Sequence, residues 1–210
     1  MRALLAAGVL LSLGACSGSF FRSHAPPPTT FLLSVKPQGA SSVMPAEVTV
    51  VMPRVRTGLD TDRIAALYPD HRLDYFAGAR WSGPLDEVVQ DLAMQALRGR
   101  FRNVRTDTSA FTAGYWVEIE VVDFQAEYAA SSGSGAPPTA HVRLLGRVGT
   151  ADDRRLLGEF EADAREPAAS NHLSAIVAAY NEAAAAALAK VAVDTAAALA
   201  RAPSARALTP

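Results

Sequence analysis

The sequence is poor in features that define several common protein classes. Among its 210 residues there is a single cysteine, Cys16, so no disulfide can form within the chain. The formal net charge is -1 and only 20% of the residues are charged, so the chain has no basic stripe of the kind that binds nucleic acid. We therefore expect no nucleic-acid partner and no disulfide framework.

Sequence motifs for catalysis and metal binding are absent as well. No glycine loop that would cradle phosphates is present, so we do not expect this chain to hydrolyse ATP. Asp60-Thr61-Asp62 lacks the further oxygen ligands of a calcium loop and is typical of a turn. The histidines show no zinc spacing, and we expect each at the surface: His24, His71, His141 and His172. We predict a protein that is not an enzyme, with no catalytic residue, metal or cofactor.

The N-terminus carries the one apolar run that approaches membrane-spanning length. A cation at Arg2 precedes an apolar stretch from Leu4 to Leu13, and this order is typical of a secretory signal peptide. The next residues, Leu13-Gly14-Ala15-Cys16, resemble the bacterial lipobox, in which the cysteine is acylated. The alternative is a chance cysteine after an ordinary leader. We predict a signal peptide over residues 1–15 and a lipid anchor on Cys16, whose several acyl chains hold it stably in a membrane.

Two further segments flank the predicted domain. Residues 16–29 contain Pro26-Pro27-Pro28 with serine and glycine, a composition that favours a flexible tether. Ser17 follows the cysteine, which resembles an outer-membrane address by the sorting rule of enteric bacteria. We predict a single domain over residues 30–200 and a disordered tail over residues 201–210.

The central stretch contains a strand, a corner and a helix start in succession. Leu73 to Ala77 alternate with a period of two, which predicts a strand with one buried face. After Trp81 the period becomes helical, and Pro84 suits the first helical position. Apolar residues then recur at three- and four-residue spacing as far as Arg98-Gly99, which predicts a helix that exposes Gln90.

The rest of the domain alternates between predicted strands and one further helix. Three alternating segments, residues 115–121, 142–148 and 156–160, predict an antiparallel meander. A long alanine-rich helix, with Asn171 as its cap, follows to about residue 200. We leave open whether its second half covers the sheet or another subunit. Shorter strands are expected at residues 31–35, 48–52, 64–68 and 101–106. The predicted fold class is α+β: a mixed, largely antiparallel sheet covered by two helices in a single domain.

The central stretch also resembles a known family. Tyr75, Arg80-Trp81 and Pro84-Leu85, followed by the amphipathic helix, are similar to the signature of the auxiliary lipoprotein component of ABC-type transport systems. Phe31-Leu32-Leu33 and residues 59–64 fit the same resemblance. Members of that family accompany MCE-type intermembrane lipid transporters, the paraquat-inducible system among them. The resemblance implies an MCE-domain protein and ABC transporter subunits as partners.

These observations lead to a first functional hypothesis and two alternatives. We expect a non-enzymatic lipoprotein of the outer membrane, facing the periplasm, that docks on the periplasmic MCE subunit, and a homo-oligomeric ring would suit that role. The residues expected at the partner surface are Tyr75, Arg80 and Trp81, although a buried corner position under the helix is the favoured interpretation for Trp81. The main alternative is a membrane-anchored carrier with a deep apolar cavity for lipid. An anchored hydrolase would need a nucleophile beside a histidine, and the sequence supports it little.

Overall fold

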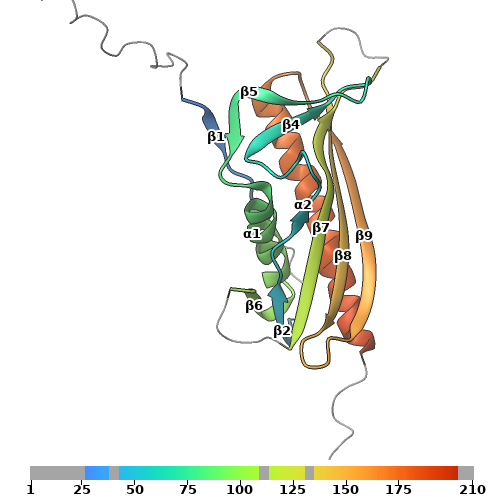
Figure 1. Cartoon of the computed structure of the whole chain (residues 1–210). Helices are drawn as coiled ribbons and strands as arrows, with labels where there is room; N and C mark the ends of the chain where they lie inside the picture. Colours follow the sequence, from blue (N-terminus) through green and yellow to red (C-terminus); the bar gives the residue numbers. More distant parts are fainter. Residues whose placement is uncertain (1–26, 38–42, 109–113, 131–134, 203–210) are drawn as a thin grey trace, which may run out of the picture.

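The protein forms one sheet and two helices around a common core. The computed structural model describes residues 27–37, 43–108, 114–130 and 135–202. Nine strands form a single mixed sheet, and helices α1 and α2 contact each other and pack against it (Figure 1). The predicted α+β class is confirmed. The elements are β1 (Thr29–Phe31), β2 (Met44–Val50), β3 (Arg54–Val55), β4 (Arg63–Leu67), β5 (Leu73–Trp81), α1 (Leu85–Arg98), β6 (Phe101–Thr106), β7 (Tyr115–Glu127), β8 (Thr139–Thr150), β9 (Leu156–Pro167) and α2 (Leu173–Arg201).

Strand β7 organises the sheet. On one side it pairs antiparallel with β8, which pairs antiparallel with β9, so the predicted meander is confirmed. On the other side three shorter strands share the length of β7, all of them parallel to it. Strand β2 pairs with its beginning, β3 with its middle and β4 with its end. The sheet therefore forks at β7.

The two branches of the fork are separate pairings. In one branch β6 lies parallel to β2. In the other, β5 lies antiparallel to β4, and β1 lies parallel to β5. These branches reach opposite ends of the molecule, as Figure 1 shows for β6 and β5.

Helix α1 follows its predicted stripe, with two differences at single residues. The predicted apolar residues from Leu85 to Ala96 are buried, and the helix ends at Arg98 as expected. Pro84 is the N-cap with extended backbone angles rather than the first helical residue. The expected exposure of Gln90 is wrong: its side chain is buried, and its amide donates to the Val50 carbonyl at 3.0 Å and to Asp107 at 3.2 Å. The amide thus links α1 to the end of β2.

Helix α2 covers the meander along its whole length. It contacts β8 and β9, and Ala198 near its C-terminus lies over Gly158 of β9, so both halves of the helix pack on this chain's own sheet. Asn171 does not cap it: the N-cap residue is His172, and the Asn171 side chain instead accepts a hydrogen bond from Tyr128 at 2.8 Å. Among the described residues, α2 is the one helix long and apolar enough to span a membrane, but half of its most apolar window is buried. Its alanines give the close approach of a core helix.

The first two strands begin earlier than the sequence predicts. Strand β1 ends at Phe31, and the chain continues as an extended segment across the seam between the helices. There the backbone N–H of Ser34 donates to Asn181 of α2, and that of Val35 donates to Gln95 of α1, so helix side chains replace a strand partner. Strand β2 likewise ends at Val50 rather than Met52.

Candidate functional site at the β5–α1 corner

A bulge in β5 decides which residues of the corner are buried. Arg63 pairs with Arg80 but Ala65 pairs with Tyr75, so β5 contains extra residues opposite β4. Gly78 lies in this bulge with φ +68°, a conformation that glycine adopts without strain. The simple alternation expected over residues 73–77 therefore fails. Leu73 and Ala77 are exposed, and the buried positions of β5 come after the bulge.

Trp81, at the end of β5, is a core residue. Its side chain is 2% exposed and lies edge to face against two aromatic rings. The ring centroids are 5.2 Å apart for Tyr180 of α2 and 6.0 Å apart for Phe124 of β7. The rings of Phe124 and Tyr180 stack on each other at 5.4 Å. This arrangement supports the buried-corner alternative for Trp81, because so buried an indole offers a partner no surface.

Tyr180 fixes the aromatic cluster to the sheet. Its hydroxyl donates to the Ala65 carbonyl of β4 at 2.6 Å. Burial raises the pKa of this phenol well above its usual range, so the hydroxyl is protonated and donates at neutral pH. Strands β4, β5 and β7 are thereby held to α2 at one point.

Arg80 points in the opposite sense from Trp81 and reaches the surface. Its side chain is 48% exposed, its Nη1 lies 3.8 Å from Asp62 Oδ2, and its Nε donates to Thr30 Oγ1 at 3.4 Å. The backbone on either side is fixed, because the N–H of Trp81 donates to the Asp62 carbonyl at 2.7 Å. The Arg80 guanidinium is thus an exposed cation on a backbone fixed by hydrogen bonds, next to strand β1.

Tyr75 is half-buried and anchors the loop before β4. Its hydroxyl donates to the Gly58 carbonyl at 2.7 Å. The guanidinium of Arg63 lies over its ring, 3.8 Å from the centroid, in a cation–π contact. Asp62 and Arg63 are adjacent in the chain, so Tyr75 and Arg80 belong to one surface cluster, which we call the corner cluster: Asp62, Arg63, Tyr75 and Arg80.

The corner cluster has the chemistry of a binding surface. Its members are a carboxylate, two guanidiniums and a phenol, which recognise a partner through ion pairs, hydrogen bonds and stacking. Within the described ranges, no group of three or more potential metal ligands was found. Cys16 lies outside the described residues, so its lipidation remains a prediction.

A second polar cluster, which the sequence does not predict, lies on the outer face of the meander. His141 of β8 is 4% exposed, so its predicted surface position is wrong. Its Nδ1 lies 2.7 Å from Glu127 Oε1 on β7 and its Nε2 lies 3.2 Å from Asp163 Oδ1 on β9. Nearby, Arg143 Nε donates to Asp123 Oδ2 at 2.6 Å. Alternation along one strand shows which face a residue occupies, but it does not show the neighbours that cover it.

The two carboxylates of β7 in this cluster favour their ionised forms. Burial by itself raises the pKa of Asp123, but hydrogen bonds from Arg143 and Gln125 outweigh it and hold that pKa below the usual value. Burial likewise raises the pKa of Glu127, and hydrogen bonds from His141, Arg165 and Gln125 lower it further than burial raises it. These ionised groups hold the three strands of the meander together.

Comparisons with known proteins agree with this architecture. The family model described as the ABC-type transport auxiliary lipoprotein component matches residues 31–192. The solved structure of XCC0632 from Xanthomonas campestris is similar, with 20% identity and a TM-score of 0.73, and the match covers 82% of this chain and 97% of that chain. The structure of an uncharacterised protein is similar at 11% identity and a TM-score of 0.62, covering 80% and 99%. No match was found among curated proteins. The match covers more than half of the residues of this chain, so the chain belongs to the family of ABC-type transport auxiliary lipoprotein components.

Proposed function

We propose that the protein is a non-enzymatic lipoprotein of the outer membrane that docks on the periplasmic subunit of an MCE-type lipid transport system. Membership of the auxiliary lipoprotein family supports a transport role in the cell envelope. The sequence Leu13-Gly14-Ala15-Cys16 and the following Ser17 support a lipid anchor and the choice of membrane. The docking surface in this proposal is the corner cluster.

The exposed guanidinium of Arg80 is the observation that carries the docking proposal. Arginine is enriched at energetically dominant positions of interfaces, particularly where its side chain is held in place before binding. Asp62 and Thr30 hold Arg80 in this way, and the buried Trp81 keeps its backbone rigid. The tether from Cys16 to Thr30 spans at most about 50 Å, so the cluster stays within that distance of the membrane anchor.

The interior of the fold favours docking over lipid carriage. A carrier needs an apolar cavity for acyl chains. In the described part of the chain, the space between the helices and the forked sheet holds the packed rings of Trp81, Phe124 and Tyr180. The alternative of a lipid-binding carrier therefore has less structural support than docking.

Affinity capture from cell envelopes tests the proposed function. The tagged full-length lipoprotein is captured from gently solubilised envelopes, and co-purifying proteins are identified by mass spectrometry. Arg80→Glu reverses the charge of the corner cluster, and Arg102→Glu makes the same change at an exposed position of β6. We expect wild type and Arg102→Glu to recover an MCE-domain protein with its ABC subunits, and Arg80→Glu to lose them.

Two results would contradict the proposal. Recovery of the transporter by a folded Arg80→Glu variant at the wild-type level would move the docking surface away from the corner cluster. Recovery of phospholipid without any transporter subunit, from wild type, would favour the carrier.

A further inference from the structure

The outer face of the meander carries charged side chains in rows that cross the strands. In one row Arg147 of β8 is in register with Glu118 of β7 and with Glu159 of β9. Another row places Arg143 of β8 opposite Asp123 of β7 and Asp163 of β9. In both, a central arginine lies between two carboxylates, the arrangement that stabilises neighbouring strands.

The row between these two breaks the pattern. Leu145 of β8 is in register with Glu120 of β7 and Glu161 of β9, so a leucine occupies the position where the neighbouring rows have an arginine. Leu145 is 38% exposed, and exposure of a large apolar side chain to water contributes no stability to the fold. Among the residues that the structure describes, the ion pairs of these two glutamates are long: Glu120 lies 3.9 Å from Arg54, and Glu161 lies 3.7 Å from Arg143.

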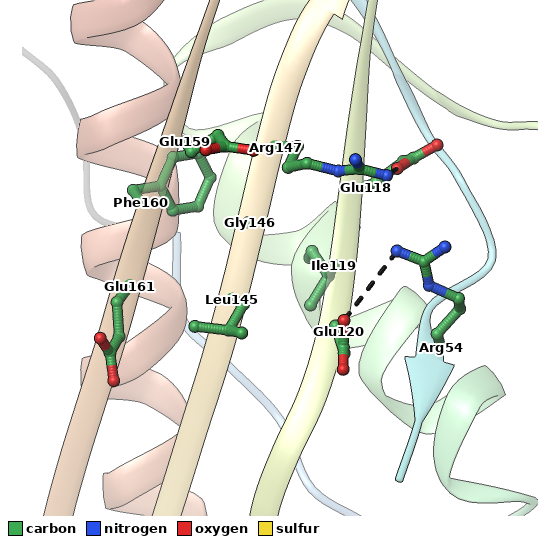
Figure 2. A pocket seen from close by; sticks show the side chains of 10 residues that line it. All are labelled: Arg54, Glu118, Ile119, Glu120, Leu145, Gly146, Arg147, Glu159, Phe160 and Glu161. Carbon is green, nitrogen blue, oxygen red and sulfur yellow. Dashed lines mark hydrogen bonds and ion pairs between the residues drawn. The ribbon is translucent and has the colours of Figure 1, made fainter.

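A groove lies at the break in the pattern. Figure 2 shows the groove on the face of the sheet that points away from α2. Its volume is about 460 Å³. Leu145 lies in the middle, flanked by Glu120 on one side and Glu161 on the other. Arg147 contacts Glu118, which leaves Glu159 without an ion pair in the described part of the chain. The groove thus combines an apolar centre with carboxylates that lack close counter-charges.

The open edge of the sheet adjoins the groove. Within the described residues β9 pairs only with β8, so the backbone groups on its other side have no strand partner. Such an edge accepts an additional strand through main-chain hydrogen bonds. Glu159 and Glu161 lie both on this edge strand and in the groove, so one extended segment can use both features.

We propose that β9 and the Leu145 groove bind an extended basic segment of a partner protein. The segment adds to the edge of β9 and extends a lysine or arginine over Glu161 toward Leu145, so that its charge faces the carboxylates of the groove from the β9 side. The aliphatic part of that lysine or arginine side chain packs on Leu145. The partner thus completes the interrupted row from outside the chain.

Charge complementarity selects this occupant over a second copy of the chain. Antiparallel pairing of β9 with itself, centred on Glu161, would bring Glu161 of one copy opposite Glu161 of the other and Glu159 opposite Asp163. Like charges directly opposite each other destabilise a strand pair. A basic strand instead meets opposite charges along the same edge. The proposal rests on the meander alone and does not require the docking at the corner cluster.

A peptide titration tests this inference with the folded protein. The probe is a blocked hexapeptide of alternating lysine and valine, and a hexapeptide of alternating glutamate and valine is the control. We expect saturable binding of the lysine peptide and slower amide hydrogen exchange within residues 156–167. We expect no binding of the glutamate peptide.

Matched variants make the test specific. Leu145→Arg completes the row from within the chain and fills the groove, so it should weaken binding of the lysine peptide by about tenfold or more. Val193→Arg adds the same charge to an exposed apolar position of α2, away from the groove, and should leave binding nearly unchanged. Glu161→Lys should weaken binding as strongly as Leu145→Arg, and Glu182→Lys on α2 should not.

Several outcomes would overturn the inference. Equal losses in Leu145→Arg and Val193→Arg would show that the peptide responds only to overall charge. Binding without a change of exchange in β9 would exclude addition to its edge. Dimerisation of the protein through β9 in the absence of peptide would assign the edge to a second copy.

Discussion

The indole of Trp81 lies edge to face on the phenol ring of Tyr180, with the ring planes at 78°. This contact joins the end of β5 to α2 and places a residue of the sequence signature inside the core. Its neighbour in the chain, Arg80, consequently projects outward from a fixed backbone. The signature thus combines a structural residue with a surface residue.

Replacing the indole should destabilise the fold strongly. Trp81→Ala removes a nearly fully buried ring from contact with Phe124 and Tyr180, and we expect it to lower the free energy of unfolding by about 3–5 kcal/mol. Trp81→Phe keeps an aromatic ring and should cost less. Urea denaturation followed by circular dichroism measures both. Equal stability of Trp81→Ala and wild type would contradict the role given to this residue.

The hydroxyl of Tyr180 should contribute separately from its ring. Tyr180→Phe preserves the aromatic packing but removes the hydrogen bond to the Ala65 carbonyl. Because that contact is buried, we expect a loss of about 1–2 kcal/mol in the free energy of unfolding. Chemical denaturation under the same conditions gives the value, and a neutral effect would show that the carbonyl finds another donor.

Acid should destabilise the meander through the carboxylates of β7. The folded state lowers the pKa of Asp123 and of Glu127, so their ionised forms contribute stability that is fully present above the unfolded pKa, near about 4. This stability is lost as the pH falls through the lowered values in the fold. We expect the thermal midpoint to be steady from pH 7 to about pH 5 and to decline below that.

Substitution of Asp123 provides the comparison for the acid titration. Asp123→Asn cannot ionise, so its thermal midpoint should be lower at pH 7 but should fall less steeply in acid than that of wild type. Differential scanning calorimetry at a series of pH values gives both curves. Parallel curves would mean that acid acts elsewhere in the protein.

Gly149 should not tolerate a side chain. A Cβ at this position would lie 2.3 Å from the Trp116 ring and 2.6 Å from the Arg155 carbonyl oxygen, and the carbonyl belongs to the backbone and cannot move aside freely. We expect Gly149→Ala to destabilise the protein by about 1–3 kcal/mol. Gly114→Ala, where no atom lies within 4 Å of the added Cβ, is the control and should change stability by less than about 0.5 kcal/mol.

The lipid anchor gives a prediction that is independent of the fold. Cys16→Ala removes the thiol that the lipobox resemblance marks for acylation. We expect the variant to move from the membrane fraction to the soluble periplasmic fraction, as detected by immunoblotting. Wild-type membrane association of the variant would show that another part of the chain is the anchor.

Hydrophobic periodicity was sufficient to predict the helices and the meander. The stripe of α1 and the alternation of β7 and β8 each bury one face of a regular element, so their pattern is visible in the sequence. The same periodicity led to the wrong prediction for Gln90. A polar residue off the apolar stripe of a helix is expected to be exposed to solvent, and its buried hydrogen-bond partners are not visible in the local pattern. The carbonyl of Val50 and the side chain of Asp107 are distant in the sequence from Gln90.

The surface sites depend on contacts that no local pattern contains. The corner cluster forms because the bulge at Gly78 changes the register between β4 and β5. The Leu145 groove becomes apparent only when the rows across β7, β8 and β9 are aligned residue by residue. The branching of the sheet could not be predicted either, because the parallel pairings with β7 join segments that are remote along the chain.

The fork at β7 determines when the fold can be completed during synthesis. Five of the first six strands form two groups, β2 with β6 and β1 with β5 and β4, whereas β3 pairs with β7, and the sheet pairings that connect the groups run through β7. A nascent chain that ends before residue 115 consequently contains more than half of the sequence but no continuous sheet. Among the described residues, no strand pairing joins the two groups until β7 emerges. The second half of the chain therefore supplies the strand that connects the sheet of the first half.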